Sequence, residues 1–273
     1  MVTVVVLGMH RSGTSVVAGM LTYLGVRMGP KGARPDWIGG NWSNPLGHYE
    51  NPQFNRLSER ALGVVTIGVR PPEAWRENLA RFDKAEVQRL VEASEGGLWG
   101  WKDAWAPLTL PLFLPYLHDA LFVIIERNPS EVADSLHRRD GVSTDDALQT
   151  VQIYQQQLRS ILDECPQVRD RSIRLTYEYI TQNPRSAARD LARFLDLPVS
   201  PETLERIATE LVMDPARVRQ AARKLALKEL ATFPKWIGWL VRQYLTGRHR
   251  RSSMVAEVWN ELVSTFKTAT RPP

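Results

Sequence analysis

Short apolar runs alternate with amphipathic segments through most of this 273-residue chain. The strand-like runs cover residues 3–7, 98–102, 121–125 and 172–177. The first and third runs contain no charged residue, which is typical of strands buried on both faces of a parallel sheet. Helical spacing of apolar residues marks 15–24, 71–96 and much of the chain from Ser143 onward. This alternation predicts an α/β fold with a doubly wound parallel sheet that binds its ligand beyond the carboxyl ends of the strands.

A loop rich in glycine and hydroxyl side chains joins the first strand to the first helix. Its sequence is Gly8-Met9-His10-Arg11-Ser12-Gly13-Thr14-Ser15. This fits the triphosphate-binding pattern G-x-x-x-x-G-K-[ST], except that Thr14 stands in place of the lysine. N–H groups at a helix N-terminus carry roughly half a positive charge and attract oxyanions, and Arg11 adds a guanidinium. The loop therefore predicts a phosphate site, with a plain turn between strand and helix as the alternative.

The run at 121–125 also ends in a candidate anion site. Arg127 follows this strand, Pro129 suits the first turn of a helix, and Ser135 lies about two helical turns beyond Arg127. Because the chain reverses at this point, Arg127 and Ser135 can hold one dianion between them. The alternatives are an ion pair between Arg127 and Glu131 and a serine that only occupies a helix face.

These two segments give the chain a family resemblance. Residues 11–15 resemble the 5′-phosphosulfate loop of sulfotransferases that use 3′-phosphoadenosine 5′-phosphosulfate (PAPS), and residues 127–135 resemble their 3′-phosphate site, R-x-P-x-x-x-x-x-S. The resemblance implies a P-loop-like fold, PAPS as co-substrate, adenosine 3′,5′-bisphosphate as product and no metal ion. The residues that it places on the nucleotide are Arg11, Ser12, Gly13, Thr14, Ser15, Arg127 and Ser135.

The segment between Met28 and Asn55 is rich in Gly, Pro, Asn and Trp, which predicts a long functional loop. Near its end, Gly-His48-Tyr-Glu50 resembles the family's G-x-[WYF]-E segment. The resemblance implies that Glu50 is the general base that removes the proton of the acceptor hydroxyl. His48 is the alternative base, because small-molecule sulfotransferases use histidine. A third reading is that Glu50 only caps the following helix or interacts with its dipole.

The run at 98–102 ends in Lys102-Asp103-Ala104. Taken alone, a Lys–Asp pair at the end of a strand is typical of a structural ion pair. Tyrosylprotein and carbohydrate sulfotransferases carry K-D-P at this point, although Ala104 stands here in place of the proline. The resemblance therefore implies that Lys102, together with Arg11, stabilises charge on the transferring sulfonyl group and the leaving phosphate.

Composition adds a charge asymmetry to this picture. The net charge is +5, and residues 211–273 hold 12 Lys/Arg against 4 Asp/Glu, which indicates an anionic partner for the C-terminal quarter. Cys165 is the single cysteine, which excludes an intramolecular disulfide and favours a reducing compartment. No signal peptide and no apolar run of ~20 residues is apparent. We therefore expect a cytoplasmic protein.

We expect one sulfotransferase-like domain over residues 1–273, with an α/β core at 1–210 and a basic helical extension at 211–273. The expected partners are the nucleotide co-substrate and a hydroxyl-bearing acceptor, with a carbohydrate or glycolipid favoured over a small metabolite and no role for nucleic acid. An aromatic stripe at 236–244 is a candidate for peripheral membrane contact, with core packing as the favoured alternative.

Two other functions are compatible with the same sequence. One is a P-loop kinase acting on a small molecule, in which Glu126 or Asp103 would hold magnesium. The other is a non-catalytic protein that only binds a nucleotide. A kinase would bind ATP with magnesium and would not bind adenosine 3′,5′-bisphosphate. A protein that only binds a nucleotide would have no activity to lose when Glu50 is replaced.

Overall fold

The computed structural model describes residues 2–32, 44, 46–64, 70–212 and 220–221. The chain divides into two compact units, Met1–Ile38 with His48–Val212 and Gly39–Gly47 with Met213–Pro273. Every helix and strand named below belongs to the first unit. The predicted stripe at 236–244, and nearly all of the predicted basic extension, lie outside the described residues, so the division of the chain at residue 210 stays a prediction.

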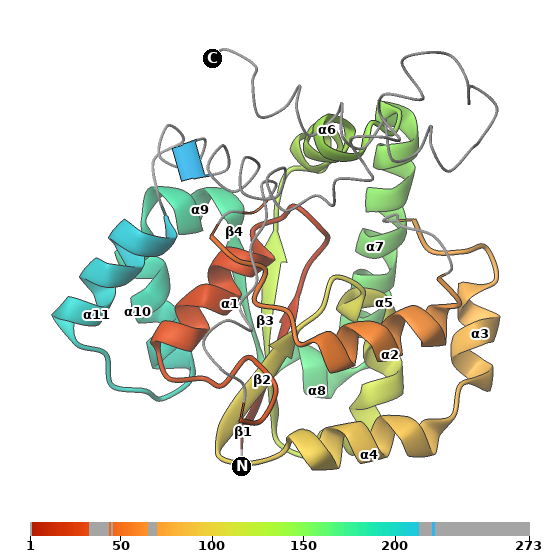
Figure 1. Cartoon of the computed structure of the whole chain (residues 1–273), viewed down its shortest axis with the longest axis horizontal. Helices are drawn as coiled ribbons and strands as arrows, with labels where there is room; N and C mark the ends of the chain where they lie inside the picture. Colours follow the sequence, from red (N-terminus) through yellow and green to blue (C-terminus); the bar gives the residue numbers. More distant parts are fainter. Residues whose placement is uncertain (1, 33–43, 45, 65–69, 213–219, 222–273) are drawn as a thin grey trace, which may run out of the picture. The chain divides into compact units, whose positions relative to one another are not determined.

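In the part of the chain that the structure describes, a parallel sheet of four strands forms the centre of the first unit (Figure 1). The strands are β1 Val2–Leu7, β2 Leu98–Lys102, β3 Ala120–Glu126 and β4 Ser172–Thr176. Their order is β2-β1-β3-β4, and Val5 of β1 lies opposite Trp101 on one side and Phe122 on the other. The four predicted strands and the parallel α/β fold are thus confirmed.

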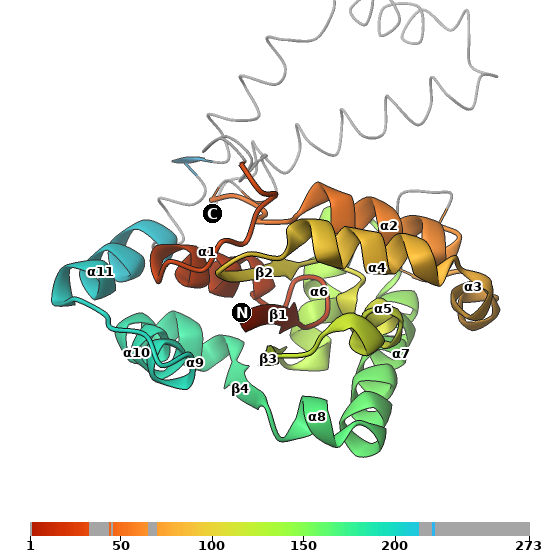
Figure 2. The ribbon, with the colours of Figure 1, turned by 90° about the horizontal axis from the view of Figure 1, so that it is seen from below.

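Helices cover both faces of the sheet (Figures 1 and 2). They are α1 Thr14–Tyr23, α2 Pro52–Leu62, α3 Trp75–Arg81, α4 Lys84–Ser94, α5 Ala106–Phe113, α6 Pro129–Asp140, α7 Thr144–Glu164, α8 Pro166–Arg169, α9 Tyr177–Gln182, α10 Pro184–Phe194 and α11 Pro201–Arg206. None of the described helices is long and apolar enough to cross a membrane. Because side chains alternate along a strand, Val4 and Val6 enter the core beneath α1, α10 and α11, while Val5 and Leu7 enter the core beneath α2, α5, α6 and α7.

Local capping decides where several helices begin. Ser143 Oγ accepts from the Asp146 N–H at 3.1 Å and donates to the Asp146 carboxylate, which caps α7. The single helix predicted over 71–96 is wrong, because the chain there forms α3 and α4. Asp83 Oδ1 accepts from the Ala85 N–H at 2.9 Å, so a new helix starts at this point.

The chain leaves β1 and β3 toward opposite faces of the sheet, because β1 leads into α1 and β3 leads into α6. In a doubly wound fold this reversal opens a crevice between the carboxyl ends of the two strands. The loop after β1 passes close to β3 here, since a Cβ on Gly8 would lie 3.0 Å from the Ile125 carbonyl oxygen. Both predicted anion sites therefore lie at one edge of the sheet.

Candidate active site

The loop after β1 presents the N-terminus of α1 without a side-chain cap. Arg11 and Gly13 both adopt left-handed backbone conformations, with φ of 67° and 93°. Gly13 also lacks room for a side chain, because a Cβ there would lie 2.6 Å from the Tyr177 ring. Ser12 and Thr14 are buried within the loop. The first N–H groups of α1 consequently have no side-chain partner, which suits the binding of an oxyanion.

The two predicted anion sites form one hydrogen-bonded network. Arg127 Nη1 donates to the Arg11 carbonyl oxygen at 2.8 Å, and Arg11 Nε donates to Ser135 Oγ at 3.0 Å. Arg127 also pairs with Glu131 at 3.0 Å, as the alternative reading expected, and its guanidinium lies 3.9 Å from the centroid of the Tyr177 ring. The structure therefore brings Arg11, Arg127 and Ser135 together and holds Arg127 in a fixed position.

A third arginine near this network was missed in the sequence. Arg139 lies one turn after Ser135 on α6, so both residues share a helix face, and Arg139 pairs with Asp140 at 2.6 Å. Burial lowers the pKa of Arg11 to about 10, and the positive charge of Arg139 adds to this shift. The sequence did hold one signal for Arg139, which is its spacing of four residues from Ser135. This concentration of positive charge suits a ligand with more than one negative charge.

Lys102 joins the loop to the predicted base. Its Nζ donates to Glu50 Oε1 at 2.5 Å, to Ser15 Oγ at 3.3 Å and to the His48 carbonyl oxygen at 3.3 Å. Lys102 is only 4% exposed. The second oxygen of Glu50 accepts from Asn55 Nδ2 at 2.9 Å. Four predicted residues therefore meet at one point, and Asn55, in the first turn of α2, is a member that the sequence did not indicate.

The protonation of Glu50 depends on two opposing effects. Burial is the largest single effect, and it raises the pKa of Glu50. The charge of Lys102 and its hydrogen bond both lower this pKa, His48 lowers it slightly more, and together they outweigh burial. The net result is a pKa below the ordinary value. Burial also lowers the pKa of His48. Both candidate bases are therefore unprotonated near neutral pH, as a general base must be.

His10 anchors the other side of the loop to α7. Its Nε2 lies 3.2 Å from the Tyr154 hydroxyl, and its ring packs edge-on against Trp105 and Tyr154. Burial, with help from the charge of Arg139, lowers the pKa of His10 to about 3. His10 is therefore neutral and serves as an uncharged support for the loop.

Replacing His10 with glutamine should reduce the loss of folding stability as the pH falls below neutral. The unfolded chain gains a proton on His10 below about pH 6.5, while the folded protein does not, so stability falls as the pH drops toward 3. We expect the free energy of unfolding of the wild type to lose about 2 kcal/mol more than that of His10→Gln between pH 7.5 and pH 5. Urea denaturation at both pH values measures this difference. The matched control is His118→Gln at an exposed position, and equal losses in wild type and His10→Gln would contradict the assignment.

Asp103 does not form the ion pair with Lys102 that the sequence suggested, because Lys102 pairs with Glu50. Asp103 is 1% exposed and its Oδ1 accepts from the Trp105 N–H at 2.9 Å, just before α5. Burial raises the pKa of Asp103 to about 7. A carboxyl group held inside the core in this way is poorly suited to the magnesium-binding role that a kinase would need. Glu126, the other candidate, lies 3.9 Å from Arg174 at the surface.

Comparison with known proteins points in one direction. A family model described as "Sulfotransferase family" matches residues 3–201. A Caenorhabditis elegans protein with the provisional name protein-tyrosine sulfotransferase is 28% identical over 107 residues, which are 38% of this chain and 41% of that protein. The chain thus spans about two fifths of the length of this curated relative.

Similar solved structures are also sulfotransferases. A sulfotransferase from Mycobacterium avium has a TM-score of 0.50 and 15% identity over 85% of this chain and 76% of its own. The sulfotransferase domain of the olefin synthase of Synechococcus PCC 7002 has a TM-score of 0.49 and 17% identity over 100% of this chain and 96% of its own. At this identity the first similarity concerns the fold, and it agrees with the P-loop-like sheet described above.

Proposed function

We propose that this chain, which belongs to the sulfotransferase family, transfers the sulfonyl group of PAPS to the hydroxyl group of an acceptor. The observation that carries the proposal is the position of Lys102, whose Nζ contacts both Ser15 of the loop and the Glu50 carboxylate. A positively charged amine and a carboxylate thereby lie beside a helix N-terminus that has no side-chain cap. This is the combination that sulfonyl transfer to a hydroxyl requires.

The donor would be held at two points. The uncapped N–H groups of α1, with Ser15 and the rest of the loop, would bind the 5′-phosphosulfate, and Arg127 with Ser135 would bind the 3′-phosphate. Arg11 connects the two points through its contacts with Ser135 and Arg127. PAPS supplies the sulfonyl group, and its nucleotide phosphate is the leaving group.

The chain's own residues account for the proton and the charge. As the acceptor oxygen forms its bond to sulfur, the bond from sulfur to the phosphate oxygen breaks, and the hydroxyl proton passes to the Glu50 carboxylate. Lys102 and Arg11 stabilise the negative charge that develops on the departing phosphate. An anion near Lys102 also competes with Glu50 for this lysine. The pKa of Glu50 would then rise, which makes Glu50 a stronger base when the donor is present.

Glu50 is favoured over His48 as the base because its carboxylate is held by Lys102 and Asn55, whereas His48 contacts Lys102 through its backbone carbonyl. The acceptor we favour is a carbohydrate or glycolipid hydroxyl, followed by a small metabolite. The name of the Caenorhabditis elegans relative adds the hydroxyl of a protein tyrosine to the panel of acceptors that should be tried. Transfer of labelled sulfate from PAPS to this panel, read by mass spectrometry, identifies the acceptor.

Nucleotide binding tests the donor. We expect adenosine 3′,5′-bisphosphate to bind without magnesium and ATP with magnesium to bind poorly, as measured by calorimetry. Arg127→Ala should weaken the binding of the bisphosphate by roughly 10–150-fold, because a hydrogen bond to a charged group is worth about 1.5–3 kcal/mol. The same change should weaken the binding of AMP far less. Arg185→Ala is the matched control, since Arg185 pairs with Glu205 at the surface. Tight binding of ATP with no response to the bisphosphate would instead favour a kinase.

A further inference from the structure

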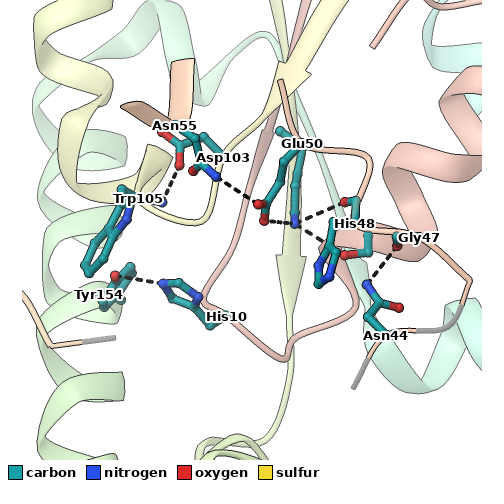
Figure 3. A network of polar contacts seen from close by, with 11 residues as sticks. His10, Asn44, Gly47, His48, Glu50, Asn55, Asp103, Trp105 and Tyr154 are labelled. Carbon is teal, nitrogen blue, oxygen red and sulfur yellow. Dashed lines mark hydrogen bonds and ion pairs between the residues drawn. The ribbon is translucent and has the colours of Figure 1, made fainter. Parts of the chain in front are cut away.

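Two oxygen atoms between α2 and the end of β2 are buried without a hydrogen-bond donor. Among the described residues, neither Asn55 Oδ1 nor Asp103 Oδ2 has a partner, and both atoms are shielded from solvent. Leaving one buried acceptor unsatisfied costs roughly 1–3 kcal/mol. The Asn55 and Asp103 side chains overlap in the view of Figure 3, and Ser58, on the same face of α2 as Asn55, lies near Asp103. Two neighbouring acceptors would repel each other unless one of them carries a proton.

No hydroxyl group among the described residues donates to Asn55 Oδ1. Thr109 Oγ1 donates its proton to the Trp105 carbonyl oxygen at 3.2 Å. Ser58 Oγ and Thr109 Oγ1 lie 3.1 Å apart, a contact in which either hydroxyl can be the donor. Ser58 lies three residues after Asn55 on the same face of α2. Its hydroxyl lowers the pKa of the Asp103 carboxyl group through a hydrogen bond, so Asn55 Oδ1 is the oxygen that still needs a donor.

The charges around Asp103 are compatible with a neutral carboxyl group. The Asp103 side chain is fully enclosed, and burial raises its pKa to about 7; Glu50 raises it slightly further, while the Ser58 hydroxyl, the Trp105 N–H and the positive charge of Lys102 lower it. From α7, Tyr154 faces the same cluster as an uncharged phenol, because burial raises its pKa.

We propose that Asp103 is a protonated positioning residue, whose Oδ2–H donates to Asn55 Oδ1 and so fixes the orientation of the Asn55 amide toward Glu50. With its oxygen held by Asp103, Asn55 turns its nitrogen to Glu50 Oε2, the contact observed at 2.9 Å. Glu50 Oε1 is held by Lys102, so the carboxylate is fixed at both oxygens. This inference rests on the proposed role of Glu50 as base, but the protonation of Asp103 can be tested without it.

Infrared spectroscopy of the ligand-free protein tests the protonation directly. At pH 6 we expect the carbonyl band of a buried carboxylic acid, shifted by ¹³C-aspartate labelling and missing from Asp103→Asn. If wild type and Asp103→Asn have the same spectrum in this region, Asp103 is ionised and the proposal is wrong. The band is independent of sulfonyl transfer, so it separates a failure of this inference from a failure of the proposed function.

Kinetics test the positioning role. Asparagine at position 103 can still accept from Trp105 and donate to Asn55, whereas leucine can do neither. We expect Asp103→Asn to retain most of the turnover at pH 6 and to lose the decline that the wild type shows as Asp103 ionises at higher pH. Asp103→Leu should lose roughly tenfold to a hundredfold in kcat with an unchanged KM for the donor. Equal losses in both variants, or the same alkaline decline in Asp103→Asn, would overturn the proposal.

Discussion

Replacing Glu50 with glutamine is expected to lower turnover by roughly 10²–10⁴-fold, the usual contribution of a general base. Glutamine keeps the size of the side chain, and its one amide oxygen can accept from Lys102 or from Asn55 but not from both, and it cannot take the acceptor's proton. Affinity for adenosine 3′,5′-bisphosphate should stay within a few-fold of the wild type, because the residues proposed to bind the phosphates are untouched. Initial rates with labelled PAPS and calorimetry with the bisphosphate measure the two quantities.

Two further variants complete this experiment. Glu77→Gln removes an exposed carboxylate on α3 and should leave turnover unchanged. His48→Asn tests the alternative base, and a larger loss in His48→Asn than in Glu50→Gln would transfer the role to His48. If wild-type protein binds the bisphosphate but shows no transfer to any acceptor, and Glu50→Gln changes nothing, the chain is a nucleotide-binding protein without catalytic activity.

Replacing Lys102 with methionine is expected to lower turnover by roughly 10²–10³-fold and also to destabilise the fold. The loss of turnover follows from removing a preorganised charge at the reacting group. The loss of stability follows because Glu50, whose side chain is 22% exposed, would be left as a partly buried carboxylate without its cation. Removing one partner of such a pair costs about 3 kcal/mol.

The pH dependence and a second substitution separate the two effects. Without Lys102, burial alone would hold the pKa of Glu50 above its unfolded value, so the stability defect should be present at neutral pH and shrink as the pH falls toward 4. Adding Glu50→Gln to Lys102→Met should recover stability at neutral pH but no turnover. Lys84→Met, at the exposed start of α4, is the matched control. If Lys102→Met alone were as stable as the wild type at neutral pH, the ion pair between Lys102 and Glu50 would contribute nothing to stability.

The sequence predicted the parts of the site that are local. The β1 loop and the segment from Arg127 to Ser135 each carry a strand, a turn and a helix start within a few residues, so pattern and spacing were enough to locate them. The break between α3 and α4 also had a local signal in Asp83, but the continuous apolar spacing on either side concealed it.

The contacts between these parts could not be read from the sequence. The alternative reading of the sequence paired Lys102 with Asp103, its neighbour in the chain, yet Lys102 reaches Glu50, 52 residues away. The difference arises because Asp103 turns back to the Trp105 N–H while the end of β2 directs Lys102 toward the loop. Asn55 and Arg139 were missed for the same reason. Asn55 is part of the site because the fold brings it to Glu50, and Arg139 because the fold brings its charge near Arg11.

The cluster of arginines at the proposed donor site has a consequence for the lifetime of the protein. Arg11 keeps its charge in a partly buried position, and the nearby charge of Arg139 makes this less favourable, in line with the lowered pKa of Arg11. A bound polyanion would relieve this cost and add its binding energy to the free energy of unfolding. We therefore expect the empty protein to be the form most exposed to proteolysis. Its abundance would then follow the supply of the donor nucleotide, even when no acceptor is present.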